Sequence, residues 1–480
     1  MSEFMNKDME KFKYLLNHSK FEFKQHQYDG VKWCVENEKT PNPVLNIRGG
    51  IIADEMGLGK TILMIGTMFV NFVRKSLIIV PPVLIQQWVK EFYKVSGHIP
   101  LVFYGQSKKQ ISLETIQKSP IIITTYNTLM NEKCILRNVI WQRVVFDEAH
   151  HLRNKKTKKH IAALNLKSRI RWFVTGTPIQ NKMNDLYSLC SLIGMERKFY
   201  RTPSNLSIVK SFILRRTKEE VGIKLPSLCK TNCVVDWQNK KEMILSEGIH
   251  SLVPNTTHVI AHNNKFKEAF GSTSGSLVAL MRAKQSCILP QLLKKSIEEY
   301  IEEGFVKPEA LEAINYTSKI DAVINKIETR KSNGRGKIVF CHFQSEIDII
   351  AERLTNIGLS HVKKYDGRNS GGKNLEKLSD VADALVIQIQ TGCEGLNLQG
   401  NYSEIYFVSP HWNPSIEDQA IARCHRIGQT KPVDVFKFEM KGFKKENDEQ
   451  IDPIALEKYV NTIQNIKRNI SVSVLDNTSD

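Results

Sequence analysis

The sequence lacks the features of secreted, disulfide-stabilised and membrane-spanning proteins. Its nine cysteines include no Cys-x-x-Cys pair, and the two nearest, Cys229 and Cys233, have no matching Cys or His cluster after them. This pattern argues against a zinc site or a disulfide framework and is typical of a reducing compartment. No apolar run is long enough to cross a bilayer, and residues 1–20 are too polar for a secretory signal. We therefore expect a protein of the nucleus or cytoplasm that is not secreted and has no membrane partner.

Acidic residues are scarce relative to basic ones. The chain has 50 Asp and Glu against 68 Lys and Arg, which gives a net charge of +18. Such an excess favours a polyanionic partner, most simply nucleic acid, although an excess of lysine can also serve solubility alone. With 480 residues, of which 41% are hydrophobic, the chain is too long for one ordinary core and too apolar for disorder. Two or more globular domains are expected.

A glycine-rich segment at residues 49–61 is the feature around which the other motifs are arranged. Residues 51–53 predict an apolar strand, and an apolar helix is expected from Thr61 to about residue 72. Gly57 and Gly59 let the backbone between them curl, so that successive N–H groups point at one anion. The dipole of the following helix adds to this effect. The segment therefore predicts a loop that holds a triphosphate.

Side chains in and near this loop complete the predicted nucleotide site. Lys60 is expected to neutralise the β- and γ-phosphates, and the Thr61 hydroxyl to ligate Mg²⁺. Asp54 stands where this motif usually has glycine, and we include it among the nucleotide-contacting residues. Gln27 lies on a helix expected over residues 21–36, and its amide suits the edge of an adenine. A surface glutamine fits that spacing equally well.

After the loop, short apolar runs alternate with helical segments, which predicts a parallel sheet with right-handed crossovers. Ligands bind such sheets at the carboxyl ends of the strands, where the polar motifs fall. Asp147 and Glu148 follow one run and suit Mg²⁺ binding and orientation of the attacking water. A basic segment at residues 153–160 fits a solvated loop or a phosphate backbone equally well. The strands are expected at residues 76–80, 121–125, 144–146 and 172–175.

A second alternating block follows a region without this rhythm. It has no Lys-Thr phosphate loop, so it cannot grip a triphosphate alone. We expect strands at residues 338–340, 361–365, 384–389, 405–408 and 433–438. The expected domains are an ATP-binding lobe (1–224), a helical insertion leading the second lobe (225–318), the second lobe (319–440), and a helix with a tail (441–480).

The second lobe carries a candidate arginine pair. A helix expected over residues 415–426 would place Gln419, Arg423 and Arg426 on one face, because they are four and three positions apart. Arginines that reach a nucleotide held by another lobe stabilise the charge that develops on the γ-phosphate. An ordinary basic helix face is the alternative interpretation.

Together these motifs resemble the Swi/Snf-type double-stranded-DNA translocases of helicase superfamily two. The resemblance is carried by Asp-Glu-Met-Gly-Leu-Gly-Lys-Thr at 54–61, Asp-Glu-Ala-His at 147–150, the Thr-Gly-Thr-Pro-Ile-Gln-Asn segment at 175–181, and residues 411–429. It covers residues 23–438 and implies an α/β fold of two RecA-like lobes, each a mostly parallel sheet flanked by helices, with a helical insertion between them. The absence of appended modules resembles compact viral forms, for which a virion or viral factory would be the location.

The resemblance also implies roles for single residues. Gln27 would contact adenine, while Asp54, Gly57, Gly59, Lys60, Thr61 and Gln419 would complete the ATP site. Thr61 and Asp147 would bind Mg²⁺, and Asp147, Glu148, Arg423 and Arg426 would be catalytic.

The implied function is an ATP-driven motor on the duplex-DNA backbone that displaces DNA-bound proteins, with the transcription machinery as a possible partner. The alternatives are a strand-separating DNA or RNA helicase acting in viral transcription, and a nucleic-acid scaffold with a vestigial ATPase.

Overall fold

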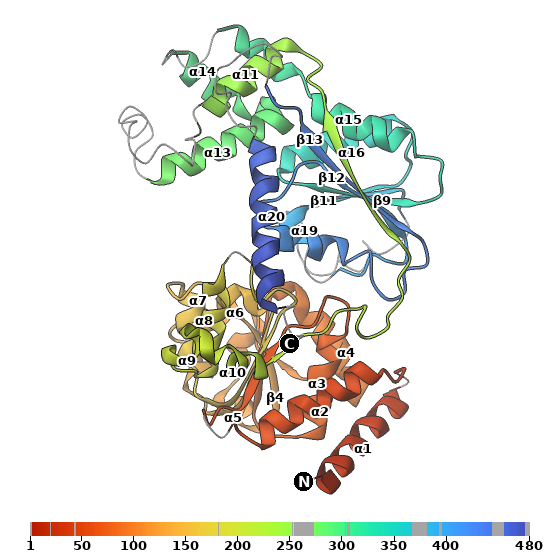
Figure 1. Ribbon diagram of the computed structural model, residues 1–480. Coiled ribbons are helices and arrows are strands. Elements are labelled where there is room, and N and C mark those ends of the chain that lie inside the picture. The colour runs from red at the N-terminus through yellow and green to blue at the C-terminus, as the bar shows by residue number, and fades with distance from the viewer. Residues whose placement is uncertain are drawn as a thin grey trace. The chain divides into compact units, whose positions relative to one another are not determined.

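The computed structural model contains two compact units, each built on one parallel sheet (Figure 1). It describes residues 2–19, 21–42, 45–180, 182–251, 253, 273–302, 304, 308–366, 382–392, 396–443 and 456–475. The first unit comprises the residues up to Lys224, with the end of the chain from Asn469, and the second is Leu225–Arg468. No helix in these ranges combines the length and the apolar character that a bilayer span requires.

The sheet of the first unit has seven strands in the order β3-β4-β2-β5-β6-β1-β7, and these neighbours pair in parallel. Neighbours that are not consecutive in sequence are joined by crossovers, as expected for an α/β domain. The strands are β1 (Gly49–Ile52), β2 (Ser76–Val80), β3 (Leu101–Val102), β4 (Ile121–Thr125), β5 (Trp141–Asp147), β6 (Ser168–Val174) and β7 (Ile213–Leu214).

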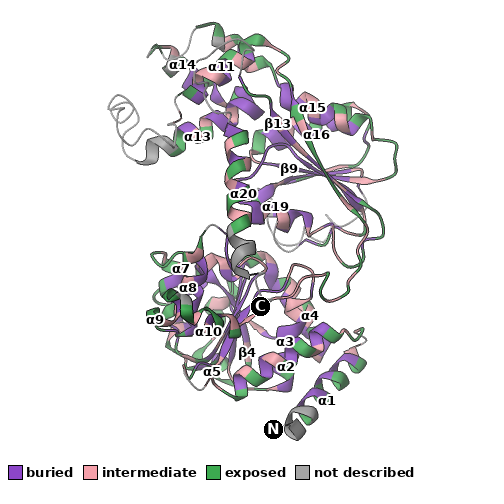
Figure 2. Ribbon diagram, viewed as in Figure 1, coloured by how far each residue is buried: buried purple, intermediate pink, exposed green. Residues whose placement is uncertain are grey.

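Helices cover both faces of this sheet, because successive strand residues point to opposite sides. Leu77 and Ile79 pack with α5, α7 and α8, whereas Ile78 and Val80 pack with α1 to α4. The central strands are buried on both sides (Figure 2). The helices are α1 (Ser2–Ser19), α2 (Gln25–Lys39), α3 (Lys60–Val70), α4 (Ile85–Ser96), α5 (Leu113–Lys118), α6 (Tyr126–Met130), α7 (Lys158–Leu164), α8 (Met183–Ile193), α9 (Arg197–Arg201) and α10 (Leu206–Ser211).

The second unit has a six-stranded parallel sheet in the order β10-β11-β9-β12-β13-β8. A separate helical cluster packs Leu245, Ile249 and Leu293 against Leu456 and Val460 of α20. The elements are β8 (Leu228–Val235), α11 (Lys240–Ser251), α13 (Thr273–Ile288), α14 (Lys294–Glu302), α15 (Ser318–Glu328), β9 (Gly336–Cys341), α16 (Gln344–Asn356), β10 (Val362–Tyr365), β11 (Ala384–Gln388), α18 (Ile389–Gly392), β12 (Tyr402–Phe407), α19 (Pro414–Ile421), β13 (Val433–Met440) and α20 (Leu456–Leu475), which belongs to this unit as far as Arg468.

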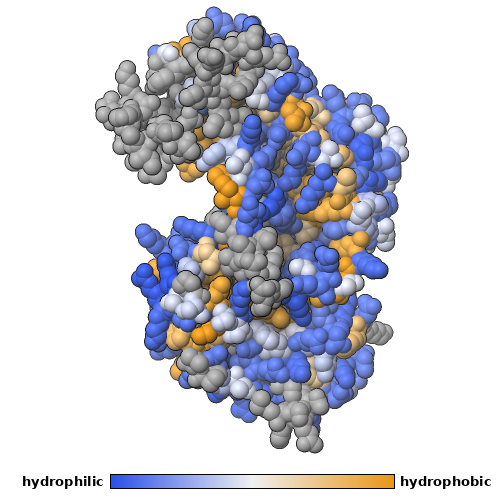
Figure 3. Space-filling model, in the orientation of Figure 1, coloured by the Kyte–Doolittle hydropathy of each residue, from blue (hydrophilic) through white to orange (hydrophobic). Residues whose placement is uncertain are grey.

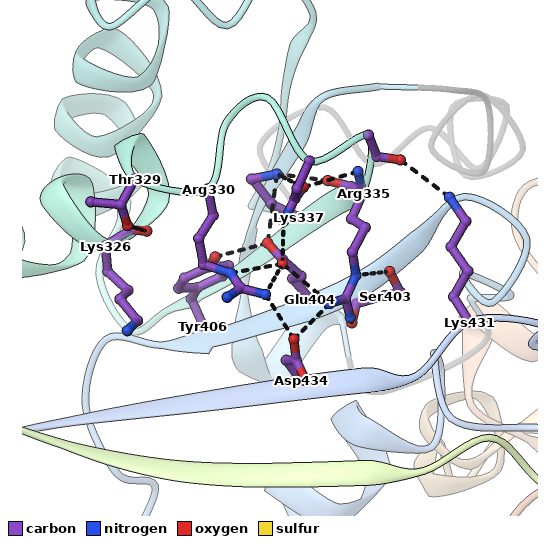
Figure 4. Close-up of polar contacts among 12 residues, drawn as sticks. Lys326, Thr329, Arg330, Arg335, Lys337, Ser403, Glu404, Tyr406, Lys431 and Asp434 are labelled. Carbon is purple, nitrogen blue, oxygen red and sulfur yellow. Dashed lines mark hydrogen bonds and ion pairs between the residues drawn. The ribbon is translucent and has the colours of Figure 1, made fainter.

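A charged cluster joins the amino ends of three strands of this sheet (Figure 4). Glu404 of β12 is fully buried and accepts a hydrogen bond of 2.8 Å from Nε of Arg330. Nζ of Lys337, at the start of β9, lies 3.5 Å from its other oxygen. Arg335 Nη1 lies 2.6 Å from Oδ2 of Asp434 on β13. Because a buried carboxylate requires such partners, the cluster holds the amino ends of β9, β12 and β13 next to one another.

The expected fold of two RecA-like α/β lobes is confirmed. Several elements were not expected, including the short edge strands β3 and β7, and two of them are instructive. The first is α1, whose Met9, Phe12 and Leu16 are buried at helical spacing within a stretch that is otherwise polar. The second is β8, whose mixed, mostly exposed side chains do not form an apolar run, because it is an edge strand of the described sheet and pairs with β13.

Candidate nucleotide-binding site

The loop between β1 and α3 has the backbone that its glycines predict. Gly57 has a φ of +93° and Gly59 a φ of +81°, in the left-handed region that favours glycine. Gly59 is also the N-cap of α3, so the helix begins at Lys60. A Cβ atom on Gly59 would lie 2.3 Å from Nε2 of Gln27. The left-handed backbone therefore favours glycine at this position, and a larger residue would have to displace the Gln27 side chain.

Gln27 lies in the first turn of α2, against the phosphate loop. Its Nε2 donates a hydrogen bond of 3.4 Å to the Leu58 carbonyl oxygen, and Nε2 of His26 lies 3.1 Å from the same oxygen. Burial lowers the pKa of His26, which favours its neutral form. The structure thus brings Gln27 to the loop, as an adenine-contacting residue would require.

Lys60 is held inside the loop. Its Nζ donates hydrogen bonds to the carbonyl oxygens of Asp54 (2.8 Å) and Glu55 (3.2 Å). A Cβ atom on Gly176, just after β6, would lie 3.5 Å from this Nζ. Thr61, the next residue of α3, is partly exposed. A lysine, a hydroxyl and the amino end of a helix are therefore adjacent, and this set of donors fits a Mg²⁺-bound triphosphate.

The Asp54 side chain has a partner that the sequence did not indicate. Arg216 donates from Nε to Oδ1 of Asp54 at 3.0 Å, and its Nη2 donates to Oδ2. The Asp54 side chain is 1% exposed. Both carboxylate oxygens are therefore engaged within the protein, which favours a structural role in the loop.

Asp147 is the last residue of β5 and is held by two aromatic side chains. Nε1 of Trp88 on α4 donates to Oδ2 of Asp147 at 2.7 Å, and the Tyr126 hydroxyl donates to its carbonyl oxygen at 2.6 Å. Burial, and then the neighbouring Glu148 carboxylate, raise the pKa of Asp147 to about 6. A nearby cation would relieve this cost, as expected for a metal ligand.

Glu148 stands beside it in an unusual conformation. Its φ of +48° places a non-glycine residue in the left-handed region, and its amide donates to Oδ1 of Asp147 at 2.9 Å. Its Oε2 lies 3.2 Å from Nδ1 of His150. A left-handed backbone is uncommon for residues other than glycine, and such strained residues cluster at functional sites. The Asp147 carboxylate therefore contacts Trp88, whereas that of Glu148 lies near His150.

The segment after β6 is tied to the basic run. Nε2 of Gln180 donates to Oγ1 of Thr177 at 3.1 Å, and the Thr177 amide donates to Oγ1 of Thr175 at 3.1 Å. Arg153 donates to Oε1 of Gln180. The first residue of the basic run therefore supports this motif. Asn181, which ends the motif, lies outside the described residues.

In the second unit, α19 is shorter than expected. We expected a helix over residues 415–426, but α19 ends at Ile421 and hydrogen-bonded turns follow it. The buried Cys424 thiol donates to the Tyr402 carbonyl oxygen at 2.8 Å, so the chain bends towards the start of β12. The helix therefore ends before Arg423 and Arg426.

The expectation that Gln419, Arg423 and Arg426 share one helix face is therefore wrong. Gln419 is a buried residue of α19, and its Nε2 has no hydrogen-bond partner among the residues described. Arg423 and Arg426 follow the helix in the turns, where Arg426 Nη1 donates to Oδ1 of Asn397. Both arginines lie on one short segment of the second unit.

Comparison with known proteins identifies the family. Residues 26–292 match the SNF2-related domain, and residues 318–428 match the helicase conserved C-terminal domain. The chain belongs to the SNF2 family. The expected resemblance to Swi/Snf-type translocases of superfamily two is confirmed.

Relatives of this SNF2 chain are larger proteins. It is 27% identical to the ATP-dependent DNA helicase DDM1 of Arabidopsis thaliana, over 87% of this chain and 58% of that protein. It is 28% identical to human chromodomain-helicase-DNA-binding protein 1, over 90% of this chain and 26% of that protein. The chain thus spans less than two thirds of either. The helicase domain of Hef from Pyrococcus furiosus shares the fold, with a TM-score of 0.52 at 17% identity over 88% of this chain and 96% of that one.

Proposed function

We propose that this SNF2 chain hydrolyses ATP with Mg²⁺ and uses the free energy to translocate on double-stranded DNA. The observation that carries the proposal is that the phosphate loop and the acidic pair lie at the carboxyl ends of two strands of one parallel sheet, β1 and β5, where the charge of Lys60 opposes the rise that burial causes in the pKa of Asp147. The names of the two relatives, an ATP-dependent DNA helicase and a helicase-DNA-binding protein, support ATP and DNA as the ligands.

The candidate site residues of the first unit have the following proposed roles. Gln27 contacts the base, the loop amides and Lys60 hold the phosphates, and Thr61 and Asp147 are the Mg²⁺ ligands. Glu148 orients the attacking water. When bound, ATP supplies the transferable phosphoryl group, and Mg²⁺ neutralises part of its charge.

The second unit supplies Arg423 and Arg426 as the residues that stabilise charge on the phosphoryl group. Their position on one segment after α19 supports this role. Removing such an arginine lowers turnover by about a thousandfold or more in related chemistry. We therefore expect Arg426→Gln to lower kcat with little change in nucleotide affinity.

The DNA contacts are proposed to go to phosphates, because the net charge is +18 and a motor that steps along DNA needs little base specificity. Figure 3 shows a largely hydrophilic face with scattered apolar positions. Bound proteins would be displaced as the motor advances, with the transcription machinery as one possible partner. Nuclear, cytoplasmic and viral locations stay predictions.

The deciding experiment measures steady-state ATPase rates with duplex DNA, single-stranded DNA and single-stranded RNA. Stimulation by duplex DNA, lost in Lys60→Ala, is expected. Stimulation by RNA alone would reject the proposal. Strand displacement on a forked duplex would instead favour a strand-separating helicase, and turnover unchanged by Lys60→Ala would favour a vestigial site.

A further inference from the structure

The chain that leaves the first unit runs beside the phosphate loop. The amide of Ile51 donates to the Phe212 carbonyl oxygen at 2.8 Å, and that of Ala53 donates to Leu214 at 2.7 Å. The pattern continues beyond β7 and β1, where the Glu55 amide donates to the carbonyl oxygen of Arg216 at 2.9 Å. The phosphate loop is thus paired, as far as Glu55, with the segment that leaves the first unit, residues 212–224, which we call the exit segment.

Arg216 adds a contact through its side chain. It donates two hydrogen bonds to the buried Asp54 carboxylate, and its Nη1 donates to the His26 carbonyl oxygen. Gly30 of α2 leaves room for it, since a Cβ there would lie 2.8 Å from Nη2. A carboxylate this deeply buried requires its partner. Arg216 therefore joins the loop to α2, whose first turn carries Gln27.

Lys218 makes a second contact, two residues further along the chain. Its amide and its Nζ each lie 2.8 Å from an oxygen of the Glu55 carboxylate. Burial raises the pKa of Glu55, but the hydrogen bonds and charge of Lys218 outweigh it and hold this pKa below its ordinary value. The Lys218 side chain is 14% exposed, so the pair is partly shielded from solvent.

The exit segment continues to Lys224, and the second unit begins at Leu225. We propose that Arg216 and Lys218 are positioning residues that tie the conformation of the phosphate loop to the segment entering the second unit. This inference rests on the proposed ATPase function. Because Asp54 and Glu55 precede the glycines of the loop, a shift of the loop upon nucleotide binding displaces the exit segment directly.

The first test uses Lys218→Met, with Lys224→Met as a matched control, because Lys224 is exposed on the same segment. We expect Lys218→Met to lower duplex-stimulated kcat roughly two- to fivefold, the effect of one partly exposed ion pair, with unchanged affinity for a fluorescent ATP analogue. The exchanged pair Glu55→Lys/Lys218→Glu should recover part of the loss. Equal rates in Lys218→Met and Lys224→Met, or no recovery in the exchanged pair, would overturn the role of Lys218.

The second test uses Arg216→Lys, which keeps the charge but loses the paired hydrogen bonds. Its Kd for the fluorescent analogue should rise by about tenfold, while its thermal unfolding stays cooperative. A Kd equal to that of the wild type would overturn the role of Arg216. Failure of the proposed function would give a different result, because wild-type turnover would then not respond to duplex DNA. The Kd of Arg216→Lys would still test the contact of Arg216 in that case.

Discussion

Nε1 of Trp88 donates a hydrogen bond of 2.7 Å to Oδ2 of Asp147, and both side chains are buried. The bond joins α4 to the end of β5, so a helix that contributes no expected catalytic residue orients the proposed Mg²⁺ ligand. It also lowers the pKa of Asp147, opposing the effect of burial and of Glu148. Metal affinity is therefore expected to depend on an aromatic residue outside the sequence motifs.

Trp88→Phe tests this dependence, since it removes the donor and keeps most of the ring. A hydrogen bond to a charged group contributes about 1.5–3 kcal/mol, so the Mg²⁺ concentration for half-maximal turnover should rise roughly tenfold. Trp141→Phe is the control, because its indole donates to the Leu136 carbonyl oxygen at 3.0 Å, away from the acidic pair. An unchanged Mg²⁺ requirement in Trp88→Phe would contradict the prediction.

Gly59→Ala separates backbone strain from loss of the Gln27 position. Gly97 is the matched control, with a φ of +71°, and a methyl group there would meet no atom within 4 Å. Both alanine variants should lose about 1 kcal/mol of stability, because both residues have a left-handed backbone. Gly59→Ala should also raise the KM for ATP, by about tenfold or more, since its methyl group displaces Gln27. Equal KM values in the two variants would show that this contact has no role.

The buried carboxyl group of Glu346 should make the stability of the folded protein depend on pH. It is fully buried at the start of α16, and burial raises its pKa from 4.5 to about 7. The folded state therefore binds this proton more tightly than the unfolded state, and stability falls as pH rises from about 4.5 to about 7. Above that range the charged form costs on the order of 3 kcal/mol.

Glu346→Gln should accordingly be more stable than wild type above pH 7, as its amide oxygen can still accept from the amides of His342 and Phe343. The gain should disappear towards pH 4.5. Urea unfolding across this range measures both effects. Glu352→Gln, an exposed change on the same helix, is the control. A gain that does not vary with pH would disprove the assignment.

Glu404 is expected to be the anchor of its charged cluster. In Glu404→Gln, Arg330, Arg335 and Lys337 lose the carboxylate that compensates them, which should cost about 3–5 kcal/mol in urea unfolding. Asp434→Asn should cost less, because the Asp434 side chain is 22% exposed. Equal losses in the two variants would place the anchor elsewhere.

The central strands and the phosphate loop could be predicted because their signals are local. Residues 77–80 form a continuous apolar run, as a strand buried on both faces does, and each lies in β2. The limits of α19 could not be predicted, since the turns after it are held by a buried contact between Cys424 and Tyr402, which are 22 positions apart. The edge strand β8 carries no apolar run that would mark it.

The sequence by itself determined that this chain has two α/β lobes and one phosphate loop, because the apolar periodicity and the glycine spacing that indicate them are contained in short stretches of sequence. Only the tertiary structure decided which residues support the loop and the acidic pair. Trp88 and Asp147 are 59 positions apart, and Arg216 and Asp54 are 162 apart. Such partners are chosen by strand order and by the burial of carboxylates, which no short stretch of sequence specifies.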